Sequence, residues 1–288
     1  MAVDFGKIFD CALRYPLKLE TYLLLFIVQL VFSLINWFLL GYSFAGITTE
    51  TASSIILGKF LASLIYLVPL MIINILVMIF LSCVYFENSL HFYKGKRKPL
   101  PKSFVIAKKR FLPLLATVVV MALIFALCFG GIVLILFSLS SSIQGSVSAA
   151  GTALLVIGGI WLLVGSIAGL VIAFFMFLAP VICVLDETGP YDSIKKSFEI
   201  IGKNKLNTLV FLIIFAVIFL ILSIVGALPE TVSSLLTGIQ AETYQAFSIE
   251  NISFFVFRAI FSAYSMLFAY SSLVNYYLSI RKRKPKII

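Results

Sequence analysis

Residues 180–205, PVICVLDETGPYDSIKKSFEIIGKNK, contain the turn around which the chain is organised. Gly189 and Pro190 end a long apolar run, and proline is well suited to the first turn of a following helix. After this turn apolar side chains recur at helical spacing, while the lysines fall largely off their face. The members of that face are Tyr191, Ile194, Phe198 and Ile201. The stretch predicts an amphipathic helix, closed near Gly202, that lies on the inner membrane surface and joins two spanning helices.

The composition is that of an integral membrane protein. Of the 288 residues, 62% are hydrophobic and 12% are charged, whereas soluble domains carry about 25% charged residues. No polar stretch is long enough to build a separate core, so we predict one membrane domain over residues 1–288. The formal charge of +10 does not indicate nucleic acid, because the basic residues flank apolar runs, where lipid headgroups are the nearest partner.

Six apolar runs reach the length of roughly 20 residues that a spanning helix needs. They cover residues 21–42, 61–86, 112–138, 153–185, 206–228 and 254–280. The fourth run is too long for one straight span, so we expect it to kink or to leave the membrane core near Pro180. The sequence therefore predicts an all-α polytopic bundle of six transmembrane helices.

The basic residues predict the orientation, because lysine and arginine are enriched in cytoplasmic loops. All of them except Lys59 and Arg258 lie before the first run, in loops 87–111 and 186–205, or in the C-terminal tail. We therefore predict a multi-pass protein of the cell membrane with both termini in the cytoplasm. The outer segment 229–253 contains apolar residues at helical spacing, which predict an interfacial helix that starts at Pro229. These residues are Val232, Leu235, Leu236 and Ile239.

The inner segments contain a weak repeat. Near the N-terminus Phe5, Ile8, Ala12 and Tyr15 have the spacing of the apolar face described above. A poorer copy lies at residues 104–111. We predict three repeat units, 4–86, 101–185 and 191–280, each an inner interfacial helix followed by a transmembrane hairpin. Because every unit has two spans, all three keep one orientation and imply an approximate three-fold axis along the membrane normal.

Four uncharged polar residues stand out within the predicted spans. They are Gln29, Asn36, Asn74 and Asn275. Such amides either line a cavity or form hydrogen bonds between helices, and packing is the more frequent use. No charged residue occupies the middle of a span, which disfavours transport coupled to ions or protons. A transporter or channel for a neutral or lipidic solute is the alternative function.

Small residues are spaced four apart in the fourth predicted span. Gly165, Gly169 and Ala173 form this ladder, and Gly158 and Gly159 precede it. Such a ladder lets another helix backbone approach closely. We expect the partner to be a helix of the same chain, with a second protomer as the alternative.

No residue pattern predicts catalysis, a cofactor or a metal site. His91 is the single histidine, and it shares a predicted helical face with Glu87. A metal site normally needs three or four ligands, which this pair does not provide. The cysteines form no CxxC pair, and we interpret them as small buried apolar residues. They are Cys11, Cys83, Cys128 and Cys183.

Basic residues beside the spans are the candidate contacts of the inner face. They are Lys108, Lys109, Arg110, Lys195, Lys196 and Lys203. The expected partners are membrane lipids, anionic headgroups among them, and either a partner protein or a second copy of the chain. Nucleic acid is not expected.

Residues 179–204, APVICVLDETGPYDSIKKSFEIIGKN, resemble a segment of six-helix proteins such as the membrane domain of glycerophosphodiester phosphodiesterases. There a proline near the inner end of a span precedes an acidic residue, a turn and a helix of the form A-L-x-x-S-x-x-L. The matching positions are Pro180, Asp186 or Glu187, Gly189, Ser197 and Gly202, whereas Ser193-Ile194 replaces Ala-Leu. Outside this segment the likeness is one of architecture.

The resemblance implies an accessory role. In the fused enzymes of that family catalysis belongs to a separate soluble barrel, for which this sequence has no room, and many stand-alone relatives are uncharacterised. We therefore expect a non-enzymatic membrane module that binds lipid or scaffolds partner proteins through its inner-face helices.

Overall fold

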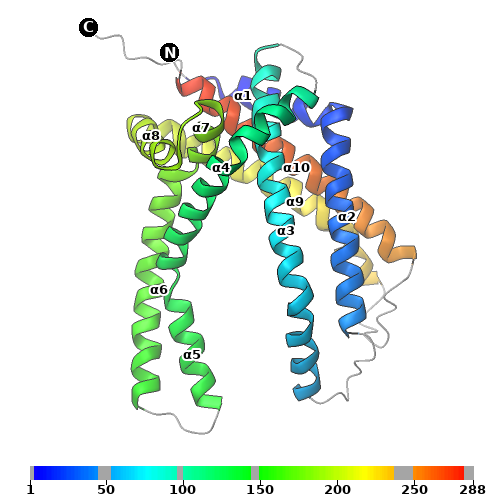
Figure 1. Ribbon diagram of the computed structural model, residues 1–288, viewed down its shortest axis with the longest axis vertical. Helices are drawn as coiled ribbons and strands as arrows, with labels where there is room; N and C mark the ends of the chain where they lie inside the picture. The colour runs from blue at the N-terminus through cyan, green and yellow to red at the C-terminus, as the bar shows by residue number, and fades with distance from the viewer. Residues whose placement is uncertain (1–2, 45–52, 96–99, 144–148, 237–248, 282–288) are drawn as a thin grey trace. The chain divides into compact units, whose positions relative to one another are not determined.

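The computed structural model describes residues 3–44, 53–95, 100–143, 149–236 and 249–281. Every regular element in these ranges is a helix (Figure 1), which confirms the predicted all-α class. The elements are α1 (Phe5–Arg14), η1 (Tyr15–Leu17), α2 (Leu19–Phe44), α3 (Ser53–Tyr93), α4 (Leu100–Cys128), α5 (Gly131–Ile143), α6 (Ala149–Met176), α7 (Ala179–Leu185), α8 (Pro190–Lys203), α9 (Lys205–Leu236) and α10 (Ile249–Arg281).

The chain is a membrane-spanning protein. Five helical stretches of the described part are long and apolar enough to cross a membrane. They are Ala62–Tyr93, Leu100–Cys128, Gly151–Leu185, Lys205–Leu228 and Val256–Arg281. A sixth arises if Phe5–Leu17 and Glu20–Ile35, which meet at a bend of 69°, count as one span. Five of the six predicted apolar runs thus coincide with a long helix or a bent pair, and the third, 112–138, does so only as far as Cys128.

The helices form two compact units. Unit 1 contains residues 1–109 and 206–288, and unit 2 contains residues 110–205. The predicted repeats do not follow this division, because residues 191–280 contribute to both units. The three-fold repeat stays a prediction.

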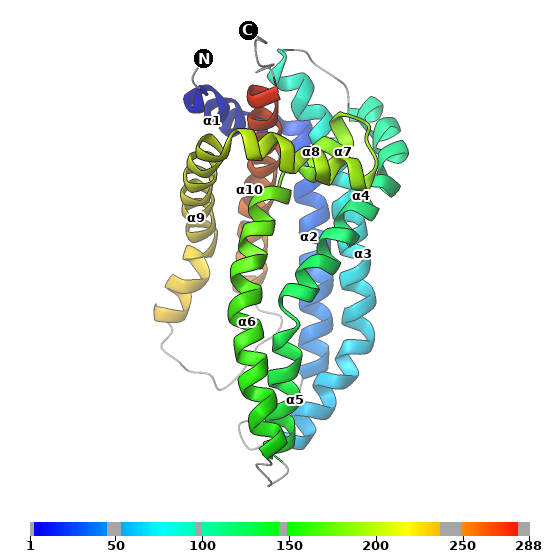
Figure 2. The ribbon, with the colours of Figure 1, turned by 90° about the vertical axis from the view of Figure 1, so that its left-hand side faces the viewer.

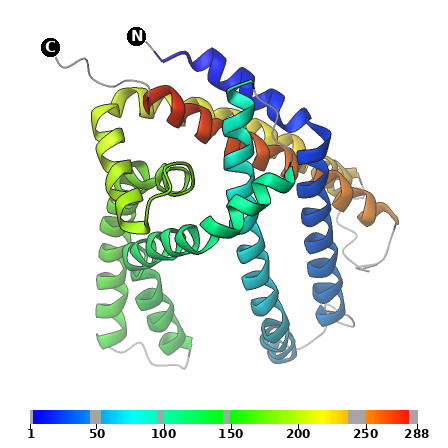
Figure 3. The ribbon, with the colours of Figure 1, turned by 45° about the horizontal axis from the view of Figure 1, so that its top comes forward.

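In unit 1, α10 is the helix against which α1, α2 and α3 pack. Figure 3 shows α1 running alongside α10. A cluster of buried residues in this core comes from η1, α2, α3 and α10: Tyr15, Leu25, Leu81, Tyr85, Ala263 and Leu267. Tyr85 remains hydrogen-bonded although its side chain is buried, because its hydroxyl donates to the Thr21 carbonyl at 3.1 Å.

An aromatic cluster ties α9 into unit 1. The ring of Phe211 on α9 is fully buried. Its centroid lies 5.5 Å from that of Phe9 on α1 and 4.1 Å from that of Tyr276 on α10, and both pairs are stacked. One turn earlier on α9, the hydroxyls of Thr208 and Tyr276 lie 2.7 Å apart. The N-terminal helix α1 and the C-terminal helices α9 and α10 therefore meet at Phe211.

In unit 2, α5 lies beside α6, as Figures 1 and 2 both show. Glycines allow the two helices to approach closely, since they have no side chain. A Cβ atom at Gly131 would lie only 2.5 Å from the Gly158 carbonyl oxygen. A side chain at Gly165 would overlap the Cys128 carbonyl oxygen, and one at Gly169 would touch Cys128 and Phe129. The predicted small-residue ladder is confirmed, and its partner is the α4–α5 junction of the same chain.

The prediction of an uninterrupted third span over 112–138 is wrong. Helix α4 ends at Cys128, and α5 begins at Gly131. Gly130 and Gly131 weaken the helix at this point, since glycine is a poor helix former. A helix end also leaves backbone carbonyls without partners, and the Trp161 indole N–H satisfies one by donating to the Leu127 carbonyl at 3.1 Å.

Two other predicted boundaries are absent. Helix α4 continues through Pro113, so residues 101–111 form no separate interfacial helix. Helix α9 likewise continues past Pro229 to Leu236, and the predicted outer helix is its last part, with Ile239 outside the described residues. Proline is tolerated inside spanning helices where neighbouring groups satisfy the backbone.

Candidate functional site

The connector between α6 and α9 has the local structure that its sequence predicts. Helix α6 ends at Met176 and α7 begins at Ala179, so the expected interruption near Pro180 is confirmed. Gly189 has an extended backbone (φ −72°, ψ 171°) and caps α8, and Pro190 occupies the first turn. Proline fits there because its missing N–H would have no partner in the first turn. Helix α8 ends at Lys203, one residue beyond the expected Gly202.

Two ion pairs hold the turn between α7 and α8. The Glu187 carboxylate pairs with Arg110 of α4, and the Asp186 carboxylate lies 3.6 Å from the Lys196 ammonium of α8. Glu187 has a φ of 57°, a left-handed conformation that is uncommon for residues other than glycine. The Cys183 thiol donates to the Thr188 carbonyl at 3.4 Å. The turn therefore links α4, α7 and α8 within unit 2.

Helix α8 packs on the protein through a serine-lined face. Ser193, Ser197 and Ile201 are its buried residues. The Ser197 hydroxyl donates to the Phe175 carbonyl at 2.6 Å, which gives a partner to one of the last carbonyls of α6. The small serine side chains bring the two helices close together.

The predicted apolar face of α8 therefore points in two directions. Ile201 is buried, but Tyr191 is 77% exposed and Phe198 is 39% exposed. The Phe198 ring also stacks on Phe175 at a centroid distance of 5.2 Å. The positions of α8 that face the protein are Ser193, Ser197 and Ile201, whereas Tyr191 and Phe198 stay exposed. The exposed rings are those that a bilayer can accommodate.

The six basic inner-face candidates fall into two groups. Arg110 and Lys196 are partly buried and pair with the turn carboxylates, so they have a structural role. The other four are exposed: Lys108 and Lys109 in unit 1, and Lys195 and Lys203 in unit 2. On α8 the two exposed lysines share the helix with the exposed Tyr191 and Phe198.

The polar residues predicted within the spans do not gather at one place. The Gln29 amide on α2 lies 3.2 Å from the sulfur of Met266 on α10 and 3.6 Å from that of Met78 on α3. Asn74 is half-buried on α3. The side chain of Asn36 lies outside the described residues. The contacts of Gln29 join three helices, as expected for a packing residue.

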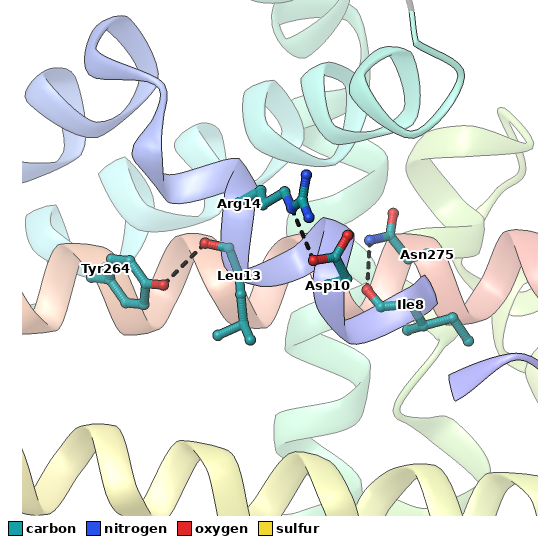
Figure 4. A network of polar contacts seen from close by, with 6 residues as sticks. All are labelled: Ile8, Asp10, Leu13, Arg14, Tyr264 and Asn275. Atoms are coloured by element: carbon teal, nitrogen blue, oxygen red, sulfur yellow. Dashed lines mark hydrogen bonds and ion pairs between the residues drawn. The ribbon is translucent and has the colours of Figure 1, made fainter. Parts of the chain in front are cut away.

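Asn275 and Tyr264 attach α1 to α10. The Asn275 amide donates to the Ile8 carbonyl at 3.2 Å, and the Tyr264 hydroxyl donates to the Leu13 carbonyl at 3.0 Å. Figure 4 shows both side chains reaching α1, on which Arg14 and Asp10 form an ion pair at 2.8 Å. The sequence marked Asn275 but not Tyr264, because a tyrosine in an aromatic-rich span carries no distinguishing signal.

A second polar contact near Asn275 was also not predicted. The Ser271 hydroxyl lies 3.1 Å from that of Ser89 on α3, and both serines are fully buried. The spacing of Ser271 and Asn275, one helical turn apart, was the available signal. It indicates a polar stripe on α10 that bonds to α1 on one side and α3 on the other.

The histidine and the cysteines, which are the residues most often used in catalysis or metal binding, do not form a cluster in the described part of the chain. His91 lies 3.3 Å from the Glu87 carboxylate, as their four-residue spacing predicts. Among the described residues no group of three histidine, cysteine or acidic side chains could hold a metal ion. All four cysteines are free; Cys83 and Cys183 are buried, and Cys11 and Cys128 are half-buried.

Comparison with known proteins places the chain in a family. A family model described as "Domain of unknown function (DUF7847)" matches residues 102–280, which is more than half of the chain. This range runs from α4 to the last turn of α10. No curated protein and no solved structure matches the chain.

Proposed function

We propose that this chain, which belongs to the DUF7847 family, is a non-enzymatic membrane module that binds anionic lipid headgroups at the cytoplasmic face. The observation that carries the proposal is the exposed side of α8. There Lys195 and Lys203 lie on the same short helix as the exposed rings of Tyr191 and Phe198. Lysines with aromatic side chains are the composition of helices that lie in a membrane interface.

The way α8 is held supports this role. Its serine face packs on α6, and the ion pairs of the preceding turn fix its start. The exposed lysines are therefore presented by a positioned helix. An accessory module of this kind also agrees with the resemblance to the membrane domain of glycerophosphodiester phosphodiesterases, in which another domain carries out the catalysis.

The competing function is transport of a neutral or lipidic solute. Gln29 and Asn275, two of the candidates for a solute path, contact neighbouring helices through the NH2 groups of their amides. These contacts support the packing interpretation and favour the binding module.

Neutralising the exposed lysines of α8 tests the proposal. The double variant Lys195→Gln/Lys203→Gln is expected to bind anionic lipid about 30-fold more weakly, because each surface lysine contributes roughly 1 kcal/mol. The measurement is native mass spectrometry of the protein from nanodiscs that contain phosphatidylcholine doped with phosphatidylglycerol. The expected result is loss of the preference for phosphatidylglycerol.

The control for this experiment is Arg258→Gln, which removes one exposed basic residue from the predicted outer side. Equal phosphatidylglycerol retention in the double variant and the control contradicts the proposal. If instead a protein co-purifies from native membranes and is lost in the double variant alone, α8 is a scaffold for a protein partner and not a lipid site.

The proposed cytoplasmic location of both termini has a separate test. In a background in which the four native cysteines are alanine, Ser253→Cys is expected to react with an impermeant maleimide on intact cells. Lys102→Cys is expected to react only after the cells are permeabilised, because the basic loop 87–111 faces inward. The reverse labelling pattern overturns the orientation.

A further inference from the structure

An open groove of about 470 Å³ lies in unit 1, between the corner that joins α1 to α2 and the helices α9 and α10. Its volume is within the range of about 300–1,000 Å³ that small-molecule sites occupy. The lining residues come from three separate parts of the chain. They are Pro16, Leu17, Tyr22, Leu222, Ile260, Phe261 and Tyr264.

The lining of this groove is apolar, and its two hydroxyls are already used. Tyr22 donates to the Ile260 carbonyl at 3.1 Å, and Tyr264 donates to the Leu13 carbonyl at 3.0 Å. No charged side chain lines the groove. A polar solute would therefore lose its hydration without gaining a partner, whereas a hydrocarbon chain meets only rings and methyl groups.

The same two hydrogen bonds hold one side of the groove together. They tie α2 to α10 and α10 to α1. On α9, Gly226 lies one turn beyond Leu222, and a side chain there would come 3.1 Å from Phe261. Helices α9 and α10 thus touch at Gly226, one turn from the groove residue Leu222.

We propose that this groove holds one acyl chain of a membrane phospholipid. The walls of the groove belong to helices that are long and apolar enough to span the membrane. In a membrane, the acyl chains of the surrounding lipids are the most abundant apolar ligands. At the α1–α2 corner the lining residue Leu17 is 74% exposed. The site is distinct from the lysines of α8 and does not depend on the function proposed for them.

The headgroup of this lipid meets a surface without net charge. Next to Leu17 the corner carries two basic residues, Arg14 and Lys18, and two acidic ones, Asp10 and Glu20. Arg14 is paired with Asp10 at 2.8 Å, and the Lys18 ammonium lies over the Phe92 ring, so both cations of the corner already have partners within the protein. We therefore expect the groove to accept zwitterionic and anionic phospholipids alike, whereas α8 is expected to select anionic ones.

Filling the groove tests the proposal. The full-length protein is reconstituted with phosphatidylcholine that carries a diazirine on one acyl chain, and crosslinked peptides are identified by mass spectrometry. Crosslinks are expected on Leu222 and Phe261, and Leu222→Trp is expected to reduce those on Phe261 to the level of exposed positions. The matched control is Ile221→Trp, because Ile221 is 54% exposed and does not line the groove.

Ile260→Trp fills the groove from α10 and serves as a second variant if Leu222→Trp does not elute as a monodisperse protein. Equal crosslinking of Phe261 in the groove variants and in Ile221→Trp overturns the proposal, as does uniform labelling along α9. The lysine variant of α8 is expected to leave these crosslinks unchanged, and Leu222→Trp is expected to leave phosphatidylglycerol retention unchanged. The two sites therefore succeed or fail separately.

Discussion

Gly165→Ala is expected to destabilise unit 2 by about 1–3 kcal/mol, the usual cost of forcing an extra group into a packed contact. The added methyl would overlap the carbonyl oxygen of Cys128, and a carbonyl in a helix cannot rotate away as a side chain can. Helix α6 would have to move from the α4–α5 junction. The measurement is the thermal unfolding midpoint in detergent, followed by circular dichroism.

A second observable reports on the same contact. The Trp161 indole lies one turn before Gly165 and donates to the Leu127 carbonyl at the break between α4 and α5. Separation of α6 from this junction is expected to lengthen or break that bond and to change the tryptophan fluorescence of the folded variant.

Gly159→Ala is the matched control for this prediction. Gly159 belongs to the same helix, but a side chain there would meet no atom within 4 Å. This variant is expected to unfold at the temperature of the parent protein or slightly above it, since alanine is the better helix former. If both variants unfold at the same temperature, the close approach at Gly165 does not stabilise the unit.

Phe211→Ala is expected to cost about 3 kcal/mol and to loosen α1. Removing a buried aromatic ring forfeits its contacts and leaves a cavity. The ring of Phe211 stacks on Phe9 of α1 and on Tyr276 of α10, so its loss weakens the attachment of two helices. The measurement combines the unfolding midpoint with hydrogen exchange, in which the amides of α1 are expected to exchange faster.

The comparison variant is Leu209→Ala, on the same helix but at a position that is 48% exposed. It removes an apolar side chain that mainly faces lipid, and lipid can fill the space. Its unfolding midpoint and the exchange of α1 are expected to stay near those of the parent. Equal protection of α1 in both variants would show that Phe211 does not hold that helix.

Much of the candidate α8 site was predictable from local sequence. The pair Gly189-Pro190 marks a cap and a first turn, and the structure has both. The direction in which α8 faces was not predictable. The predicted apolar face includes Ile201, which is buried, and Tyr191 and Phe198, which are exposed, while Ser193 and Ser197 are buried. At a membrane surface an apolar side chain is as well placed against lipid as against protein, so periodicity alone does not distinguish the two.

The breaks in the helices show the same limit. The interruption near Pro180 was visible because the run was too long for one span, whereas the break after Cys128 was not. A helix could also have continued through Gly130 and Gly131. The residue that Gly131 contacts, Gly158, is 27 positions further along the chain, so local sequence does not reveal the contact. Pro113, although a poor helix former, lies inside α4. A residue that weakens a helix becomes a break only where other segments stabilise the separated ends.

By itself, the sequence determined the helical class, the apolar runs that span the membrane, the connector at 180–205 and the glycine ladder of α6. These follow from local chemistry, because a backbone in lipid must satisfy its own hydrogen bonds and a helix does so within one segment. Only the tertiary structure decided the partner of the ladder, the pairing of Arg110 with the turn, and the groove beside Tyr264. Each of these joins segments far apart in the chain, and in a protein whose surface and interior are both apolar, composition does not reveal which helices meet.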